Sequence, residues 1–268
     1  MSGELVFIGL GLHDEKGLSL RGQEEAKSCD FLFAEFYTSA MPGLSTEGLR
    51  RSVNKEVQLL SRKEVEERPE QNILSKSKTS KVGFLVPGDP MVATTHVDLR
   101  MRAHKAGIRT RIIHSASVAS AAAGVTGLQS YKFGRTVTIP VSAEEELPES
   151  ITTHIKANFA AGLHTLALLE IDVENNRHIT IPQALKALIA CQSKMDSIVG
   201  PQTLVLGIAR LESPDMVVKA GAISELMKTD FGEPPYALII PSRLHFVEAE
   251  ALTLFCGAPK NLVNQTHD

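Results

Sequence analysis

Several residue types are scarce in this chain of 268 residues, and each scarcity excludes a class of protein. Tryptophan is absent and aromatic residues make up 5%, which leaves few stacking platforms for single-stranded nucleic acid. The three cysteines, Cys29, Cys191 and Cys256, are far apart and odd in number, so neither a disulfide framework nor a thiolate zinc site is expected. With a formal net charge of −3, the chain lacks the concentrated positive field that nucleic acids and anionic membranes attract.

Long apolar runs are missing as well. The first apolar segment, Val6 to Leu12, is interrupted by Gly9 and Gly11 and follows no basic region, so we do not expect a signal peptide. No run approaches the roughly 18 residues that are needed to span a bilayer. We therefore expect a cytoplasmic protein without nucleic-acid or membrane partners, whose thiols are small buried hydrophobes in a reducing compartment.

The chain does contain short runs rich in Val, Ile, Leu and Phe, which alternate with longer amphipathic stretches, as in buried parallel sheets. This alternation predicts two α/β domains with right-handed crossovers, residues 1–114 and 115–268. The predicted strands are Leu5–Leu10, Phe31–Glu35, Val57–Leu60, Val82–Val86, Thr110–His114, Thr136–Val141, Thr165–Ile171, Thr203–Ala209 and Ala237–Pro241. The predicted helices are Ser19–Cys29, Thr46–Val53, Thr95–Ala106, a small-residue stretch within 115–127, Pro148–Ala161, Gln183–Cys191, Ile223–Lys228 and Leu244–Phe255.

A glycine-rich turn ends the first predicted strand. Gly9 and Gly11 let the backbone approach a ligand closely, and ligands of open α/β sheets bind beyond the carboxyl ends of strands. The dinucleotide fingerprint requires a third glycine at position 14, where Asp14 stands, so the usual nucleotide site is not predicted. The segment is either a tight turn that leads into a helix or a ligand-binding loop.

A second turn, VPGDP from Val86, follows the clearest predicted strand. Its prolines and glycine place Asp89 beyond the end of that strand, where a carboxylate can accept hydrogen bonds from a ribose or an amine. Capping of the next helix by Asp89 is the alternative. The segment from His114 to Val118 repeats this geometry after the next strand, and its hydroxyls can cap a helix, bind a ligand, or do both.

Other polar residues leave their roles open. Glu35, at the end of the second strand, can pair with a sugar hydroxyl or a substrate amine, or lie in a solvated turn. His245 and Glu248, three residues apart on the last helix, are expected to form a surface pair. A basic cluster either meets an acidic protein partner or forms a solvated face, which is more common for like charges. This cluster comprises Arg100, Arg102, Lys105, Arg109 and Arg111.

Common catalytic motifs are missing. The nine histidines form no H-E-x-x-H, and no two histidines lie close together with a carboxylate, so a zinc hydrolase is not predicted and no metal is expected. Neither G-x-S-x-G nor a Walker A lysine loop occurs, which excludes an α/β-hydrolase and a P-loop protein.

Seven stretches of the chain, in this order, resemble one known family. They are FIGLGLHDEKGLSLRG from Phe7, CDFLFAEFYTS from Cys29, VPGDPMVATTHVDLRMRAHKAG from Val86, TGLQSYKFG from Thr126, GLHTLALLEI from Gly162, DFGEPPYALIIP from Asp230 and LHFVEAE from Leu244. They identify the chain as similar to the diphthine synthases, which belong to the tetrapyrrole-methylase-like class of S-adenosylmethionine-dependent methyltransferases. The resemblance covers nearly the whole chain, and the combination of AEFYTS with PGDPxVATTH is specific to this family within the class.

The resemblance implies two α/β domains of the tetrapyrrole methylase type, with the cofactor S-adenosyl-L-methionine in a cleft between them, and a homodimer. It implies diphthamide biosynthesis as the function: methylation of the amino group of the 3-amino-3-carboxypropyl arm on a modified histidine of translation elongation factor 2. In the eukaryotic branch a carboxyl group is methylated as well, whereas the compact length of this chain is more similar to the archaeal form.

The resemblance also implies which residues contact the cofactor. Most of their side chains are apolar, which suits a ligand held by backbone N–H and C=O groups over an apolar bed for adenine. Tyr236 stands where related archaeal enzymes often carry His, and its backbone can still serve. The implied contacts are Leu12, Asp89, Val92, Ser117, Val118, Leu169, Leu211 and Tyr236.

Methyl transfer from a sulfonium is an in-line displacement in which the donor already carries the activation, so the protein mainly positions the two reactants. The accepting amine must be neutral, and desolvation favours that form. Glu35 and Tyr37 are candidate bases, but the catalytic residues are not determined by the sequence. A methyltransferase acting on corrin or porphyrin precursors, and a non-catalytic partner of the elongation factor, are the alternatives.

Overall fold

The computed structural model describes residues 3–143, 146–173, 175–195 and 198–265. The chain divides into two compact units, Met1–Val118 and Ala119–Asp268. The division falls in the segment that follows the fifth strand, and the sequence analysis placed its boundary after residue 114, in the same segment. Within the described residues, no helix is both long enough and apolar enough to cross a membrane.

The first unit has alternating strands and helices, as the sequence pattern predicts. Its strands are β1 (Glu4–Gly9), β2 (Phe31–Ala34), β3 (Gln58–Leu59), β4 (Lys81–Val86) and β5 (Arg109–Ile113). Its α-helices are α1 (Leu20–Ser28), α2 (Thr46–Val53), α3 (Ile73–Ser77) and α4 (His96–Lys105), and α5 (Val118–Thr126) begins at its last residue. Ser61 and Glu64 form a capping box that leads into a π-helical turn, η2 (Lys63–Glu67).

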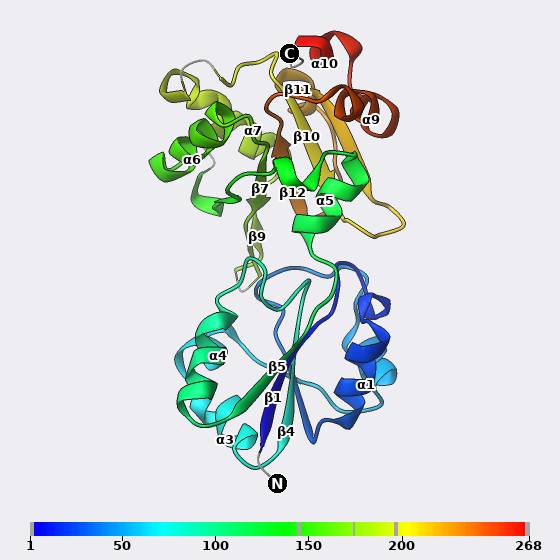
Figure 1. The fold of residues 1–268 in the computed structure, drawn as a ribbon, viewed down its shortest axis with the longest axis vertical. Helices are drawn as coiled ribbons and strands as arrows, with labels where there is room; N and C mark the ends of the chain where they lie inside the picture. The colour runs from blue at the N-terminus through cyan, green and yellow to red at the C-terminus, as the bar shows by residue number, and fades with distance from the viewer. Residues whose placement is uncertain (1–2, 144–145, 174, 196–197, 266–268) are drawn as a thin grey trace. The chain divides into compact units, whose positions relative to one another are not determined.

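The strands of the first unit form a parallel sheet in the order β3-β2-β4-β1-β5. The three inner strands β2, β4 and β1 are buried on both faces of this sheet, because their alternate apolar residues point to opposite sides. Leu5 and Phe7 join a cluster with residues of α3 and α4, whereas Val6 and Ile8 pack with residues of α1 and α2. Figure 1 shows α1 on one face of this sheet and α3 and α4 on the other.

The second unit has a mixed sheet. Its strands are β6 (Val137–Ile139), β7 (Thr165–Leu169), β8 (Ile171–Asp172), β9 (Arg177–His178), β10 (Leu204–Ala209), β11 (Val217–Ala222) and β12 (Tyr236–Ile240). The helices that complete it are α6 (Glu149–Ala160), α7 (Ile181–Ala190), α8 (Ile223–Leu226), α9 (Phe246–Cys256) and α10 (Lys260–Gln265). The sequence analysis missed β11 and the β8–β9 hairpin, because Lys219 and the polar residues of the hairpin interrupt their apolar pattern.

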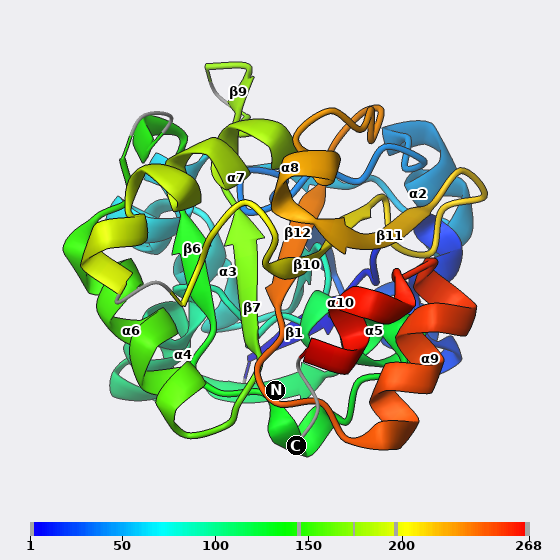
Figure 2. The ribbon, with the colours of Figure 1, turned by 90° about the horizontal axis from the view of Figure 1, so that it is seen from above.

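The sheet of the second unit has the order β11-β10-β12-β7-β6, and Figure 2 shows its strands side by side. Strands β6 and β7 are parallel, whereas β7, β12, β10 and β11 pair antiparallel in turn. Helices α6, α7 and α8 cover one face with a large apolar cluster, and α9 packs against β11. As predicted, the last long helix ends at Gly257, which adopts the left-handed conformation that glycine tolerates best.

Candidate functional site

In the first unit, the loops after β1 and β4 are hydrogen-bonded to each other at the carboxyl edge of the sheet. The Gly11 N–H donates to the Gly88 carbonyl oxygen at 3.2 Å, and the Gly88 N–H donates to the Gly11 carbonyl oxygen at 2.7 Å. Both glycines have positive φ angles, 80° and 67°, which residues with a Cβ atom disfavour. The two glycine turns, which the sequence left open as structural turns or ligand loops, therefore form one structure.

Gly9, the last residue of β1, lies where three loops approach most closely. A Cβ atom on Gly9 would lie 2.6 Å from the Gly88 carbonyl oxygen and 2.8 Å from the Ser115 Cβ atom. Both distances are well below ordinary van der Waals contact, so only glycine fits between the loops that follow β4 and β5. Glycine is therefore needed at position 9 because neighbouring segments approach it closely, and not because of its backbone conformation.

Asp89 joins the loop after β4 to the segment after β5. One carboxylate oxygen accepts a hydrogen bond from the Met91 N–H at 2.9 Å, and the other contacts His114 Nδ1 at 2.7 Å and the Ser115 N–H at 3.3 Å. The side chain is buried, whereas His114 is exposed. Thr95 precedes α4, and no side chain caps that helix, so the alternative that Asp89 is its cap is wrong.

The other implied cofactor residues of the first unit lie near this edge. Leu12 directly follows Gly11 and is half-buried, and Ser117 and Val118 follow the Asp89 contacts of the segment after β5. Val92 is 38% exposed, in a turn closed by its N–H and the Asp89 carbonyl oxygen. The structure therefore brings the glycine turn, the GDP loop and the segment after β5 together, with Val92 at their margin.

Glu35 also lies at this edge, but it is fully buried rather than directed to a substrate. One carboxylate oxygen accepts the N–H groups of Tyr37 and Thr38 at 2.9 and 3.0 Å, and the other accepts the Thr38 hydroxyl at 2.5 Å. Burial raises the pKa of Glu35 to about 7, although these hydrogen bonds act in the opposite direction. The solvated turn that the sequence allowed is excluded, and the carboxylate organises the loop after β2.

In the second unit, the three remaining implied residues lie at one edge of its sheet. Leu169 ends β7, Tyr236 begins β12, and β12 runs antiparallel to both β7 and β10. Tyr236 pairs with Ala209, the last residue of β10, two residues before Leu211. Strand register therefore gathers side chains from distant segments, and all three are buried with at most 8% exposure.

Arg210 organises the two loops that carry Leu211 and Tyr236, and sequence reasoning missed it. Its guanidinium is 7% exposed and donates to the carbonyl oxygens of Phe231, Glu233 and Asp215. Its Nε atom lies 2.6 Å from the Asp215 carboxylate. Arg210 adopts a positive φ of 52°, which non-glycine residues rarely do. A buried arginine with main-chain acceptors fixes loops rather than binding an exposed anion.

Tyr236 is held from both sides. Its hydroxyl donates to the Gly232 carbonyl oxygen, and its ring lies 5.9 Å from the ring of His178, centroid to centroid. Burial raises the pKa of this phenol. Because the hydroxyl is already hydrogen-bonded within the loop that Arg210 fixes, a ligand could contact Tyr236 only through its ring or its backbone.

Glu248 is a second buried residue with several hydrogen-bond partners. The expectation that it lies on the surface with His245 is therefore wrong. Its carboxylate is fully buried and accepts hydrogen bonds from Lys132 at 2.6 Å and from the N–H groups of Gln129 and His245. His164 lies 3.0 Å away on the same carboxylate. Burial opposes the charge, but these bonds outweigh it and lower the pKa of Glu248 to about 2. These bonds fix the start of α9 and stabilise the second unit.

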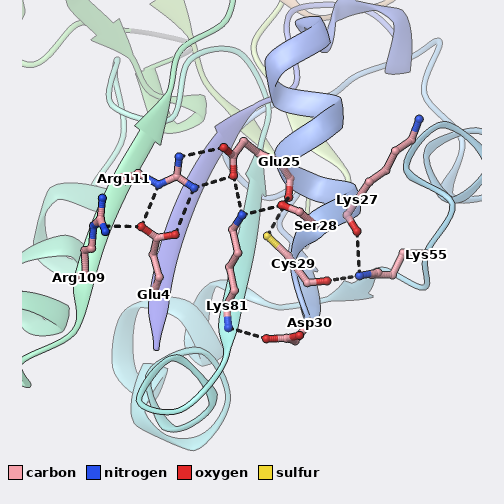
Figure 3. A network of polar contacts seen from close by, with 10 residues as sticks. All are labelled: Glu4, Glu25, Lys27, Ser28, Cys29, Asp30, Lys55, Lys81, Arg109 and Arg111. Atoms are coloured by element: carbon pink, nitrogen blue, oxygen red, sulfur yellow. Dashed lines mark hydrogen bonds and ion pairs between the residues drawn. The ribbon is translucent and has the colours of Figure 1, made fainter. Parts of the chain in front are cut away.

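Three members of the basic cluster, Arg102, Arg109 and Arg111, are paired with carboxylates, and Figure 3 shows the part around β1. Arg111 forms ion pairs with Glu4 at 2.9 Å and Glu25 at 2.6 Å, and Arg109 also contacts Glu4. The Arg111 hydrogen bonds, aided by Lys81, lower the pKa of Glu25 to about 2 despite partial burial. In the rest of the cluster, Arg102 pairs with Asp98 and Glu70, and Arg100 donates to the Thr110 hydroxyl. These pairs weaken the case for an acidic protein partner at this surface.

Within the ranges that the structure describes, no group of three or more His, Cys, Asp or Glu residues is placed to hold a metal ion. Asp89 and Glu35, at the edge of the first sheet, already accept hydrogen bonds from the protein. The edges therefore offer main-chain groups, small residues and apolar side chains as ligand contacts.

Comparison with known proteins identifies the family. Residues 4–226 match the model of the tetrapyrrole (corrin/porphyrin) methylases. The chain is 42% identical over 262 residues to a diphthine synthase of Methanothermobacter thermautotrophicus, covering 97% of this chain and 98% of that protein. It is 44% identical over 264 residues to a diphthine synthase of Methanosarcina mazei, covering 97% and 98%.

A solved structure gives the same result. The crystal structure of a diphthine synthase superposes with a TM-score of 0.87 at 36% sequence identity, covering 97% of this chain and 98% of that one. Sequence and fold thus agree along nearly the whole length. The chain therefore belongs to the tetrapyrrole methylase family and, within it, to the diphthine synthase family of S-adenosylmethionine-dependent methyltransferases.

Proposed function

We propose that this chain methylates the amino group of the 3-amino-3-carboxypropyl arm on the modified histidine of translation elongation factor 2, in diphthamide biosynthesis. The observation that carries the proposal is the 42–44% identity to diphthine synthases over 97% of the chain. The family model alone would equally suit a methyltransferase of corrin or porphyrin precursors. The near-complete match to one subfamily favours the protein substrate.

We propose two sets of cofactor contacts, one at each sheet edge described above. These residues suit S-adenosyl-L-methionine, because most of their side chains are apolar and the glycine turns allow main-chain groups to approach a ligand closely. The first set is Leu12, Asp89, Val92, Ser117 and Val118, and the second is Leu169, Leu211 and Tyr236. In each set, buried polar side chains fix the loops: Asp89, itself a proposed contact, together with Glu35 in the first unit, and Arg210 in the second.

The bound cofactor supplies an activated methyl group on a sulfonium, so the chain itself needs to position the acceptor and exclude water. The accepting amine resembles that of lysine, with an ordinary pKa of about 10.4, and must lose a proton first. Apolar surroundings favour its neutral form. Glu35 is an unsuitable base, because its carboxylate is fully buried and its oxygens already accept hydrogen bonds.

The test is mass spectrometry of elongation factor 2 that bears the unmethylated intermediate, before and after incubation with this chain and S-adenosyl-L-methionine. We expect mass increases in whole-methyl steps on the modified histidine. Parallel reactions contain a reduced tetrapyrrole precursor in place of the factor, or lack the cofactor. Methylation of the tetrapyrrole with an unchanged factor would overturn the proposal in favour of the alternative.

We further propose that the enzyme is a cytoplasmic homodimer. The three cysteines are free and buried, which suits a reducing compartment. Helix α9 carries four large exposed apolar side chains, and exposed apolar surface can mark a protein contact. These side chains are Phe246, Val247, Leu254 and Phe255. Light scattering at several concentrations tests the dimer, and a mass of one chain throughout would contradict it.

A further inference from the structure

Glu35 and His96 face each other inside the first unit, although they come from different elements. Glu35 follows β2, and His96 begins α4. Glu35 Oε1 lies 3.8 Å from His96 Nε2, and the two side chains are 0% and 1% exposed. Two ionisable groups this close in a buried site influence each other's protonation. The protonation states of Glu35 and His96 are therefore coupled.

The contacts of His96 fix the position of its ring hydrogen. His96 Nδ1 lies 3.3 Å from the Pro90 carbonyl oxygen, which can only accept, so Nδ1 carries the hydrogen. In the neutral ring, Nε2 then presents a lone pair, and it has no hydrogen-bond partner among the described residues. A lone pair that faces an ionised Glu35 in a buried site is unfavourable. One proton must therefore lie on Oε1 or on Nε2.

We propose that Glu35 and His96 retain a single proton between them and that this proton fixes the loop after β2 against the loop after β4. The two residues are then positioning residues for the first set of cofactor contacts, a consequence that rests on the proposed function. Glu35 holds the N–H groups of Tyr37 and Thr38, and His96 holds the carbonyl oxygen of Pro90, which adjoins Asp89. Loss of the proton places a repulsive contact between the two loops.

The charged groups around the pair come from three elements. Arg62, before η2, favours the carboxylate form of Glu35 and stacks on the Tyr37 ring at 5.2 Å. Glu66, within η2, favours the charged form of His96. Asp98, on α4, lines a cavity of about 160 Å³ together with Glu66 and His96.

Burial nevertheless dominates for both members of the pair. It raises the pKa of Glu35 to about 7 and lowers that of His96 to about 4. Between these values the proton resides on Glu35 and both groups are neutral, which is the least costly state in an apolar site. Above about pH 7 the carboxylate ionises against the imidazole lone pair, so the loop junction weakens as pH rises.

The first test detects the protonation of the two groups directly and does not depend on enzyme activity. In histidine-labelled protein, nitrogen NMR distinguishes the two ring tautomers, and His164 is an internal comparator. Its Nδ1 accepts the Ser242 N–H at 3.1 Å, so its hydrogen lies on Nε2 and donates to Glu248. We expect opposite tautomers for the two rings, and a shift of His96 Nε2 near pH 7 that is lost in Glu35→Gln. A His96 spectrum of the Nε2–H form, or one unchanged by Glu35→Gln, would overturn the shared proton.

The second test measures the binding of S-adenosylhomocysteine by calorimetry on either side of pH 7. For the wild type, we expect Kd to rise above about pH 7 by up to about tenfold per pH unit, the limit for one proton. In Glu35→Gln the profile is flat, because an amide cannot ionise. Glu66→Gln is the matched control, since it removes a neighbouring carboxylate that does not share the proton, and it keeps the wild-type profile.

The outcomes separate the two levels of the proposal. Parallel pH profiles for the wild type and Glu35→Gln would overturn the positioning role even if the NMR result supports the shared proton. If the wild type binds no S-adenosylhomocysteine at any pH, the proposed cofactor site fails and the positioning role fails with it. The NMR result still decides whether the pair retains one proton.

Discussion

Replacement of Gly9 by alanine tests the loop junction at the carboxyl edge of the first sheet. The added Cβ atom would lie 2.6 Å from the Gly88 carbonyl oxygen, whereas ordinary contact begins near 3.4 Å. The loop after β4 must therefore move by about 0.8 Å, or β1 must shift by a similar amount. Because the second contact, Ser115 Cβ at 2.8 Å, lies on another loop, no single small movement relieves both.

The cost follows from known overpacking. Extra methyl groups in a tightly packed site typically cost about 1–3 kcal/mol. For domains of this size, each kcal/mol lowers Tm by about 2–4 °C. A displacement close to 1 Å in a group that positions reactants can reduce the rate about 100-fold. We therefore expect Gly9→Ala to lower kcat/KM by about two orders of magnitude with a modest loss of stability.

The assay combines thermal unfolding with methyl transfer at varied cofactor concentration. Gly124→Ala is the matched control, because Gly124 lies on the exposed side of α5 with nothing within 4 Å of an added Cβ atom. There we expect unchanged activity and a slight gain in stability, since alanine favours a helix over glycine by about 1 kcal/mol. Wild-type Tm and kcat/KM in Gly9→Ala would refute the account of the junction.

Gly88→Ala separates crowding from backbone conformation. An added Cβ atom meets only the Ala116 carbonyl oxygen at 3.9 Å, so there is space for it. Its φ of 67° is nevertheless left-handed, which costs a residue with a side chain about 1–2 kcal/mol. We expect a loss of stability like that of Gly9→Ala but a smaller loss of kcat/KM. The reverse order would show that the junction depends on conformation rather than on close approach.

Three further substitutions test the polar hubs. Arg210→Lys keeps the charge but loses the planar fork that reaches several carbonyl oxygens, so we expect cofactor KM to rise about tenfold, equivalent to about 1.4 kcal/mol, with kcat nearly unchanged in steady-state kinetics. An equal loss in kcat would contradict a role confined to the loops. For Glu248, the lowered pKa means that the unfolded chain binds more protons, so about 3 kcal/mol of stability is present above pH 4.5 and is lost as pH falls toward about 2. Urea titrations at several pH values should show this loss in the wild type and not in Glu248→Gln. Asp89→Asn places an amide against the N–H of Ser115, which should reduce kcat/KM at least tenfold while lowering stability by only about 1 kcal/mol. A large loss of stability without loss of activity would contradict it.

Features that depend on local sequence were predictable. The buried strands β1 and β4 are continuous apolar runs, and α4 lies between Thr95 and Gly107 as predicted from its end signals. The glycine turns at Gly11 and Gly88 were identified from composition, because positive φ restricts the choice of residue. The sequence could not show that these two turns hydrogen-bond to each other, since that depends on the adjacency of β1 and β4.

The second unit shows what local pattern misses. Strand β11 reads VVKAGA, and only its second half is buried, so its apolar signal is short. It pairs with β10 antiparallel, as β10 does with β12 and β12 with β7, so the sheet is mixed rather than parallel. Pairing direction depends on how the chain returns between strands, and the apolar pattern of each strand is the same in either direction. The alternation therefore predicted an α/β unit without its sheet order.

The buried charges were the least predictable residues of all. Glu35, Glu248 and Arg210 each look like surface residues in sequence, because an unpaired charge in the core is very costly. Each becomes acceptable only through partners supplied by the fold: Lys132 and His164 lie more than 80 positions before Glu248. Glu35 differs from the others because its nearest ionisable partner, His96, is neutral by the same burial. Burial outweighs its main-chain donors and the nearby Arg62 cation, so this carboxyl group retains a proton into the neutral range, and its ionisation can then act on the neighbouring loops.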